Sequence, residues 1–266
     1  MRGVAGAARV AAVDAPDWLP LLHELADQAD AISTRYFRSS DLPVERKADR
    51  SLVTKADLEV ESAIRDTMAR RHPQLGVFGE EHGQHEGDGE GRLIVDPIDA
   101  TANFARGIPI FATLLAIEIG EEVVAGLVSA PALHGRWHAA RGAGAWAGDR
   151  RLRVSKVGEL ADAQVFHSSL AGAEAVPDTA KIPALLAGSW RQRGVGDFYQ
   201  HVLVAEGCGE LALDPVVMPW DIAPLQILVE EAGGRSTTTK GERSIRKGSL
   251  VSSNGLLHDV ALAAFA

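Results

Sequence analysis

The hydrophobic residues at the start of the chain recur at helical spacing and predict two amphipathic helices. The first runs from Trp18 to about Phe37, with Asp17 as its N-cap, and the second covers 55–71. A short strand is expected next, at 76–78. The inward face of the second helix is predicted to consist of Leu58, Ala63, Ile64 and Met68.

Further along, the apolar residues form short runs, which are typical of strands. The polar, glycine-rich stretch 82–92 predicts a loop in which His82 and His85 are solvated, because nothing nearby completes a tetrahedral metal site. Beyond it, strands are predicted over 93–95, 111–119, 123–129, 136–140 and 144–147.

A second series of elements begins near Ser155. It consists of predicted strands at 164–168, 211–213 and 250–252, and of predicted helices at 179–187, 198–206, 222–232 and before Phe265. The mixture predicts an α/β (α+β) protein with helices and sheets in layers. We expect a frayed N-terminal extension (1–15), an α+β subdomain (16–154) and a C-terminal α/β subdomain (155–266).

The composition of the chain limits the kinds of ligand and surface that the protein is expected to bind. The 266 residues are 46% hydrophobic and carry a net charge of −9, which argues against a nucleic-acid polymer as ligand but allows a small phosphorylated metabolite beside a metal. No apolar run is long enough for a membrane span, and residues 1–15 lack the features of a signal peptide. The lone Cys208 is expected to be a buried thiol in a reducing, cytoplasmic protein.

Two carboxylates three positions apart follow the apolar run at 93–95. Pro97 lies between Asp96 and Asp99 and interrupts the strand, so that a turn can present both carboxylates and the Ile98 carbonyl toward one point. Oxygen clusters of this kind suit Mg²⁺, which commonly serves phosphate chemistry. The simpler alternative is a capped helix that follows a strand and happens to carry acidic residues.

Two more acidic residues can join this cluster. Glu80 follows the strand predicted at 76–78, and Asp221 precedes an apolar helix, where it also fits the simpler role of an N-cap. The backbone amides of Ala100 and Thr101 are expected at the start of another helix, where N–H groups favour an anion such as phosphate.

These motifs occur in one order, namely SLVTKAD (51–57), GEE (79–81), DPIDAT (96–101) and WD (220–221) with EAGG (231–234). In this order and spacing the chain resembles the inositol monophosphatase family of Mg²⁺-dependent, lithium-sensitive phosphomonoesterases. Within that family it is most similar to actinobacterial histidinol-phosphate phosphatases, on KAD (47–49), RGIP (106–109), SAPAL (129–133), WHAARG (137–142), GDF (196–198), VAEG (204–207) and NGLLHD (254–259).

The resemblance implies the sugar-phosphatase fold shared with fructose-1,6-bisphosphatase, in which helix and sheet layers alternate. It also implies two or three Mg²⁺ ions in each site. One ion would be held by Glu80, Asp96 and the Ile98 carbonyl. A second would be held by Asp96, Asp99 and Asp221. A homodimer is implied as well.

The resemblance further implies roles in the reaction. Glu80 and Thr101 would orient the attacking water, and the amides of Ala100 and Thr101 would bind phosphate. Asp214 and Asp197 would meet the alcohol or amine end of the substrate. The catalytic residues would thus be Glu80, Thr101 and Asp99.

The chain departs from the family pattern at three positions. Ala100 replaces a glycine, Ala102 replaces a threonine or lysine, and Ser51 stands where an acid often supports the residue equivalent to Thr101, with Asp49 two positions earlier. We expect Ala100 to have a helical φ, because a helix is predicted to start beside it, and we expect its methyl group to tune the site without disabling it.

We expect L-histidinol phosphate as the substrate, in histidine biosynthesis. The alternatives are an inositol or other cyclitol phosphate, or a nucleoside monophosphate of a specialised pathway. A different class of function, a binding or regulatory paralogue with weakened catalysis, would follow if the alanine at position 100 had removed turnover. The retention of Glu80 and Thr101 argues against it.

Overall fold

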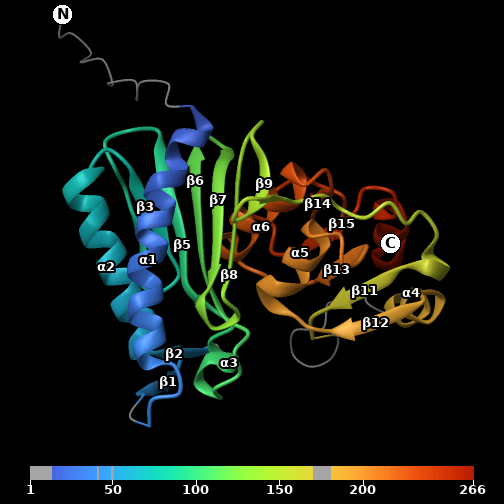
Figure 1. The fold of residues 1–266 in the computed structure, drawn as a ribbon, viewed down its shortest axis with the longest axis horizontal. Coiled ribbons are helices and arrows are strands. Elements are labelled where there is room, and N and C mark those ends of the chain that lie inside the picture. The colour runs from blue at the N-terminus through green and yellow to red at the C-terminus, as the bar shows by residue number, and fades with distance from the viewer. Residues whose placement is uncertain (1–13, 41, 49–50, 170–180) are drawn as a thin grey trace, which may run out of the picture.

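A computed structural model describes residues 14–40, 42–48, 51–169 and 181–266 of the chain. Two helices, α1 (Leu19–Tyr36) and α2 (Lys55–Arg71), pack together on one face of a large sheet (Figure 1). Helix α2 begins as predicted, because Thr54 and Asp57 form a capping box. Helix α1 is preceded by a 3-10 turn that contains Asp17, so the predicted N-cap is wrong; the Asp17 amide donates to the Asp14 carbonyl.

The large sheet has eight strands in the order β10-β9-β8-β7-β6-β5-β3-β4. All of its strand pairs are antiparallel except β3 with β5, which run parallel. Its strands are β3 (Gly76–Gly79), β4 (Gly83–His85), β5 (Gly91–Asp99), β6 (Ala112–Ile119), β7 (Glu122–Ala130), β8 (Gly135–Ala140), β9 (Gly144–Ala147) and β10 (Arg150–Arg151).

Helix α6 (Pro219–Glu231) covers the opposite face of this sheet and separates it from a second sheet (Figure 1). Its residues from Ile222 to Val229 are all buried, as expected for a helix between two layers. The helix lies close against β7 at Gly126, where a Cβ atom would be 2.7 Å from Ile227 Cγ2. Glycine at this position therefore allows the close approach of helix and sheet.

The second sheet has five strands in the order β12-β11-β13-β15-β14 and packs with three helices. Its strands are β11 (Gln164–His167), β12 (Arg191–Gly194), β13 (Leu211–Asp214), β14 (Arg235–Thr237) and β15 (Leu250–Ser253). Its helices are α4 (Ile182–Gly188), α5 (Asp197–Ala205) and α7 (His258–Leu262). The structure thus contains the predicted alternation of helix and sheet layers. Its division into subdomains stays a prediction, since α6 belongs to the core of the first sheet.

Several local expectations are wrong, and tertiary contacts explain most of them. Residues 83–85 form strand β4 beside β3 instead of a loop, and Leu58 is 42% exposed on α2. Cys208 is exposed, because it lies in the turn that joins α5 to β13. Of the extension predicted at 1–15, residues 1–13 lie outside the described residues. None of the described helices is long and apolar enough to cross a membrane.

Candidate metal and phosphate site

A bulge in β5 brings the two predicted aspartates to one side of the sheet. Asp96 pairs with Leu114 and Asp99 with Ala112 of β6, so two residues of β5 oppose Thr113 alone. Residues three apart in a regular strand point to opposite faces, and the additional residue of a bulge reverses this. The Thr113 hydroxyl holds the bulge by donating to the Pro97 carbonyl at 2.8 Å. Both carboxylates therefore point into one site.

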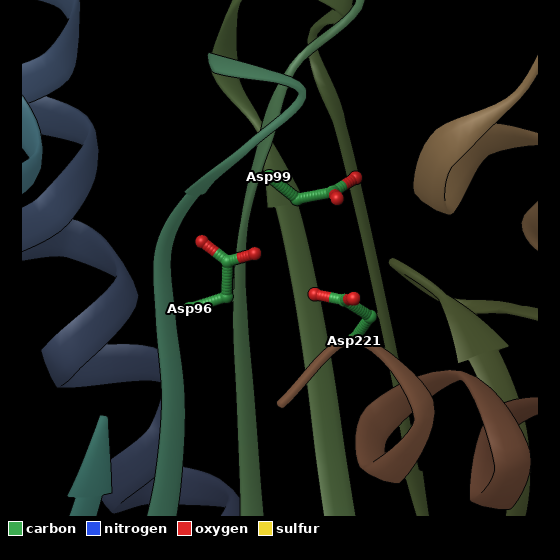
Figure 2. Close-up of side chains that lie close together, drawn as sticks. All are labelled: Asp96, Asp99 and Asp221. Atoms are coloured by element: carbon green, nitrogen blue, oxygen red, sulfur yellow. The ribbon is translucent and has the colours of Figure 1, made fainter. Parts of the chain in front are cut away.

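Asp221 completes this cluster from α6 (Figure 2). Carboxylate oxygens of Asp96, Asp99 and Asp221 all lie within 4.8 Å of one another. Asp221 is the third residue of its helix, so the N-cap role is wrong, and its Oδ2 accepts the Met218 amide at 2.8 Å. The open end of α6, with its partial positive charge, faces the cluster.

The three carboxylates repel one another at a site where Asp96 is buried and Asp99 and Asp221 are half-buried. Burial raises the pKa of the Asp96 and Asp99 carboxyl groups well above the usual range, and neighbouring carboxylates raise it further. Burial likewise raises the pKa of Asp221 to about 7. Asp96 Oδ1 is buried and accepts no hydrogen bond. Such oxygen-only ligands with an unsatisfied atom fit a hard divalent cation such as Mg²⁺.

Glu80 lies in the same cavity, which has a volume of about 430 Å³. Lys47 Nζ donates to the Oε1 atoms of both Glu80 and Glu81 at 2.7 Å. Burial by itself lowers the pKa of Lys47, but its hydrogen bonds to the two glutamates outweigh burial and raise it. Burial raises the pKa of Glu81 to about 7. The cavity is lined by Ser51, Leu52, Glu80, Asp96, Ile98, Asp99, Ala100, Thr101, Ala102, Asp197, Met218, Trp220 and Asp221.

Ala100 has the left-handed conformation (φ 65°, ψ 44°) before helix α3 (Thr101–Ala105), so the expected helical φ is wrong. The physical reason is the sharp turn between β5 and α3, in which the Ala100 carbonyl accepts the amides of Asn103 and Phe104. An L-residue with this φ brings its Cβ close to the following carbonyl oxygen, which is why glycine suits the position.

Thr101 has a partner that the sequence reasoning missed. Its hydroxyl lies 3.0 Å from the Ile98 carbonyl and 3.3 Å from Asp57 Oδ1. Burial raises the pKa of Asp57 to about 6, and its other oxygen caps α2 at Thr54. The capping box signalled Asp57 as a helix residue only. Of the two supports that we predicted, Ser51 lines the cavity, whereas Asp49 lies outside the described residues.

The predicted substrate residues line a second cavity of about 190 Å³, which shares Asp99, Asp197 and Asp221 with the first. Asp214 is buried there, and its oxygens accept Ser168 Oγ at 2.8 Å and Gln200 Nε2 at 3.1 Å. Burial, with Asp214 adding to it, raises the pKa of Asp197 to about 6.

The two cavities are joined by a contact between main chain and side chain. The Phe198 amide, at the start of α5, donates to Asp99 Oδ2 at 2.8 Å. Asp197 directly before it has φ 51°, and its Oδ2 lies 3.4 Å from Asn103 Nδ2. The carboxylate cluster thus fixes the position of the segment that carries Asp197.

Comparisons with known proteins point to one family. The model of the inositol monophosphatase family matches residues 15–266. The histidinol-phosphatases of Mycobacterium tuberculosis and Streptomyces coelicolor are similar at 44% and 42% identity, over 92% and 93% of this chain and 96% and 97% of theirs. The inositol-1-monophosphatase of Rhizobium meliloti is 34% identical, over 80% of this chain and 82% of its own.

Two solved structures share the fold. An extragenic suppressor protein from Bartonella henselae has a TM-score of 0.87 at 28% identity, with 93% of this chain and 97% of that chain covered. An IMPase from Thermotoga maritima has a TM-score of 0.84 at 30% identity, with 94% and 96% covered. The predicted layered fold is confirmed.

The left-handed backbone at Ala100 predicts that Ala100→Gly stabilises the protein. Relief of strain should outweigh the larger entropy of the unfolded glycine chain, for a net gain of roughly 0.5–1 kcal/mol and an increase in Tm of about 2 °C. Ala102→Gly, two positions on inside α3, is the matched control and should lower stability. A lower Tm for Ala100→Gly in differential scanning calorimetry would contradict the strain.

The buried carboxylates predict an inverted pH dependence of stability in EDTA. Asp221, with a pKa of about 7, holds a proton that the unfolded chain releases near pH 4, so stability falls as pH rises from about 4 to 7. Asp221→Asn should flatten this slope and stabilise the protein at pH 8 by roughly 1 kcal/mol or more, which is an increase in Tm of at least about 2 °C. Identical slopes for the two proteins in thermal melts would refute this origin.

Proposed function

The chain belongs to the inositol monophosphatase family and is a phosphoric monoester hydrolase, and we propose that it hydrolyses L-histidinol phosphate to L-histidinol and phosphate. The observation that carries the choice of substrate is the 190 Å³ cavity beside the carboxylate cluster. Two acids line it, the buried Asp214 and the more exposed Asp197, and both suit the cationic amine of histidinol. Two histidinol-phosphatases that match nearly the whole chain support the same choice.

We propose Mg²⁺ as the metal, with two or three ions in each site. Glu80, Asp96 and the Ile98 carbonyl would hold one ion. Asp96, Asp99 and Asp221 would hold another, and the unsatisfied Asp96 Oδ1 supports both assignments. When bound, Mg²⁺ neutralises phosphate charge and lowers the pKa of its water.

The chain itself would orient the reactants. Glu80 and Thr101 would position the attacking water, since both line the 430 Å³ cavity and the Thr101 hydroxyl is fixed beside Asp57 and the Ile98 carbonyl. Asp99 would hold the metal beside the phosphate site. The amides of Ala100 and Thr101 would bind the phosphate oxygens. Ser51 or Asp49 would give further support to Thr101.

The setting of the enzyme completes this proposal. We propose a cytoplasmic homodimer that acts in histidine biosynthesis on a small metabolite, and binds neither a nucleic-acid polymer nor a membrane. The net charge of −9 supports the exclusion of nucleic acid. Light scattering at micromolar concentration measures the oligomeric state, and a monomeric mass would remove the dimer from the proposal.

The first experiment is a phosphate-release assay over L-histidinol phosphate, inositol 1-phosphate and a nucleoside monophosphate. We expect Mg²⁺-dependent turnover, highest for L-histidinol phosphate. Asp99→Asn should lose at least about 100-fold in kcat, because the amide removes one ligand charge at nearly constant volume. Full Mg²⁺-dependent activity of Asp99→Asn would contradict the assigned site. No turnover of any ester by the wild type would favour a binding or regulatory paralogue.

The second experiment concerns the amine. Asp214→Asn should raise the KM for L-histidinol phosphate by about tenfold or more, because a charge-assisted hydrogen bond contributes roughly 1.5–3 kcal/mol. Inositol 1-phosphate, which carries no amine, is the control, and its KM should change much less. Equal increases for both substrates would count against recognition of an amine by Asp214, and the same comparison with Asp197→Asn tests the other acid.

A further inference from the structure

A buried carboxylate outside the metal cluster holds the turn that carries Glu80. Glu61 lies on α2 and is completely inaccessible to solvent. Its Oε2 accepts the Glu81 amide at 2.8 Å, and its Oε1 accepts the His82 amide at 3.2 Å. A buried charge without partners is costly, so these two main-chain donors both stabilise Glu61 and are fixed by it.

Arg65, one helical turn further along α2, adds another contact to the turn that carries Glu80. Its Nε donates to Glu61 Oε1 at 2.8 Å, and its Nη2 donates to the Gly83 carbonyl. The Glu61–Arg65 pair therefore binds the chain at three successive points after Glu80, two amides and one carbonyl. The guanidinium also balances the charge of the carboxylate, which lies too deep for water to do so.

Gly79, directly before Glu80, shows how closely this carboxylate approaches the turn. A Cβ atom at position 79 would lie 2.1 Å from Glu61 Oε1 and 2.4 Å from its carboxyl carbon. Any side chain would displace Glu61, so the glycine of the GEE motif is explained by this contact. Its backbone φ lies outside the left-handed region, and close approach alone accounts for the glycine.

Glu80 is consequently fixed from both sides. Its own amide donates to the carbonyl of Val95, the residue before Asp96 in β5, at 3.2 Å. The amide of the next residue, Glu81, donates to Glu61. The first hydrogen bond sets the distance between the Glu80 and Asp96 backbones. The second sets the direction of the chain after Glu80. Together they fix the backbone from which the Glu80 side chain enters the cavity that Asp96 also lines.

We propose that Glu61, with Arg65, is the positioning pair of the metal site and sets its affinity for Mg²⁺ through the backbone of Glu80. This inference rests on the proposed function, in which Glu80 is a metal ligand. Groups that orient metal ligands commonly change metal affinity or activity by 10–100-fold when they are replaced. Glu61 touches neither substrate nor metal in this scheme, so its effect is confined to orientation.

The test is Glu61→Gln, because the amide keeps the volume but sets an NH₂ group against one of the main-chain donors. Calorimetric titration with Mg²⁺ alone, without substrate, should give a Kd at least about tenfold higher than that of the wild type. At saturating Mg²⁺ the KM for the phosphomonoester should be unchanged. A wild-type Kd for Mg²⁺ together with a lower Tm would overturn the proposal, since Glu61 would then be merely structural.

Glu59→Gln is the matched control. Glu59 lies on the same helix and is also hydrogen-bonded and ion-paired, to Tyr36 and Arg35, but it does not contact the Glu80 turn. Its replacement likewise removes a negative charge paired with an arginine, and should leave the Kd for Mg²⁺ unchanged. An equal loss of affinity in both variants would overturn the proposal, because general loosening of α2 would then explain it.

Two further variants distinguish an error in the proposed metal ligand from an error in the proposed positioning role. Glu80→Gln should also weaken Mg²⁺ binding; if it binds as the wild type does, both the proposed ligand and the inference drawn from it are wrong. If it weakens binding while Glu61→Gln does not, only the positioning role is wrong. Should Glu61→Gln fail to fold, Arg65→Lys retains the charge but loses the forked contact, and a wild-type Kd for that variant would overturn the pair's role.

Discussion

The mutual repulsion of one buried and two half-buried carboxylates is the constraint on which the site depends. Asp96, Asp99 and Asp221 converge within 4.8 Å, and burial raises the pKa of each. Such a cluster is unfavourable for an empty fold, so the surrounding structure has to hold it together. The bulge in β5, the start of α6 and the Phe198 amide all act in this way. The cluster lowers the stability of the metal-free protein, and a bound cation restores that stability.

The two halves of the site are built by different means. The proposed metal ligands Glu80, Asp96 and Asp99 come from the large sheet, where strand register and main-chain hydrogen bonds set their positions. Asp214 and Asp197 come from the second sheet and the start of α5. The side chains of the second half can therefore vary while the main-chain amide of Phe198 keeps its hydrogen bond to Asp99. Relatives named for different phosphate esters fit this arrangement.

Much of the fold was predictable because its signals are local. The strand at 144–147 and the helix at 55–71 have the predicted bounds, since their hydrophobic spacing and a capping box specify them. The left-handed φ of Ala100 was not predictable, because the neighbouring helix suggested the opposite. Strand β4 was missed because its residues are polar and mostly exposed, although it forms a short hairpin with the neighbouring β3. The exposure of Cys208 was missed because it depends on which segments pack around the turn.

The same distinction applies to the site. Acidic motifs predict which residues carry the chemistry, and Figure 2 shows three of them side by side. They do not reveal what keeps those residues in place. Asp57 beside Thr101 and Glu61 beside the Glu80 turn both lie on α2, where the sequence indicates only a helix. One helix supports both sides of the cavity. A change in how α2 packs against the sheet would therefore change the geometry of the site.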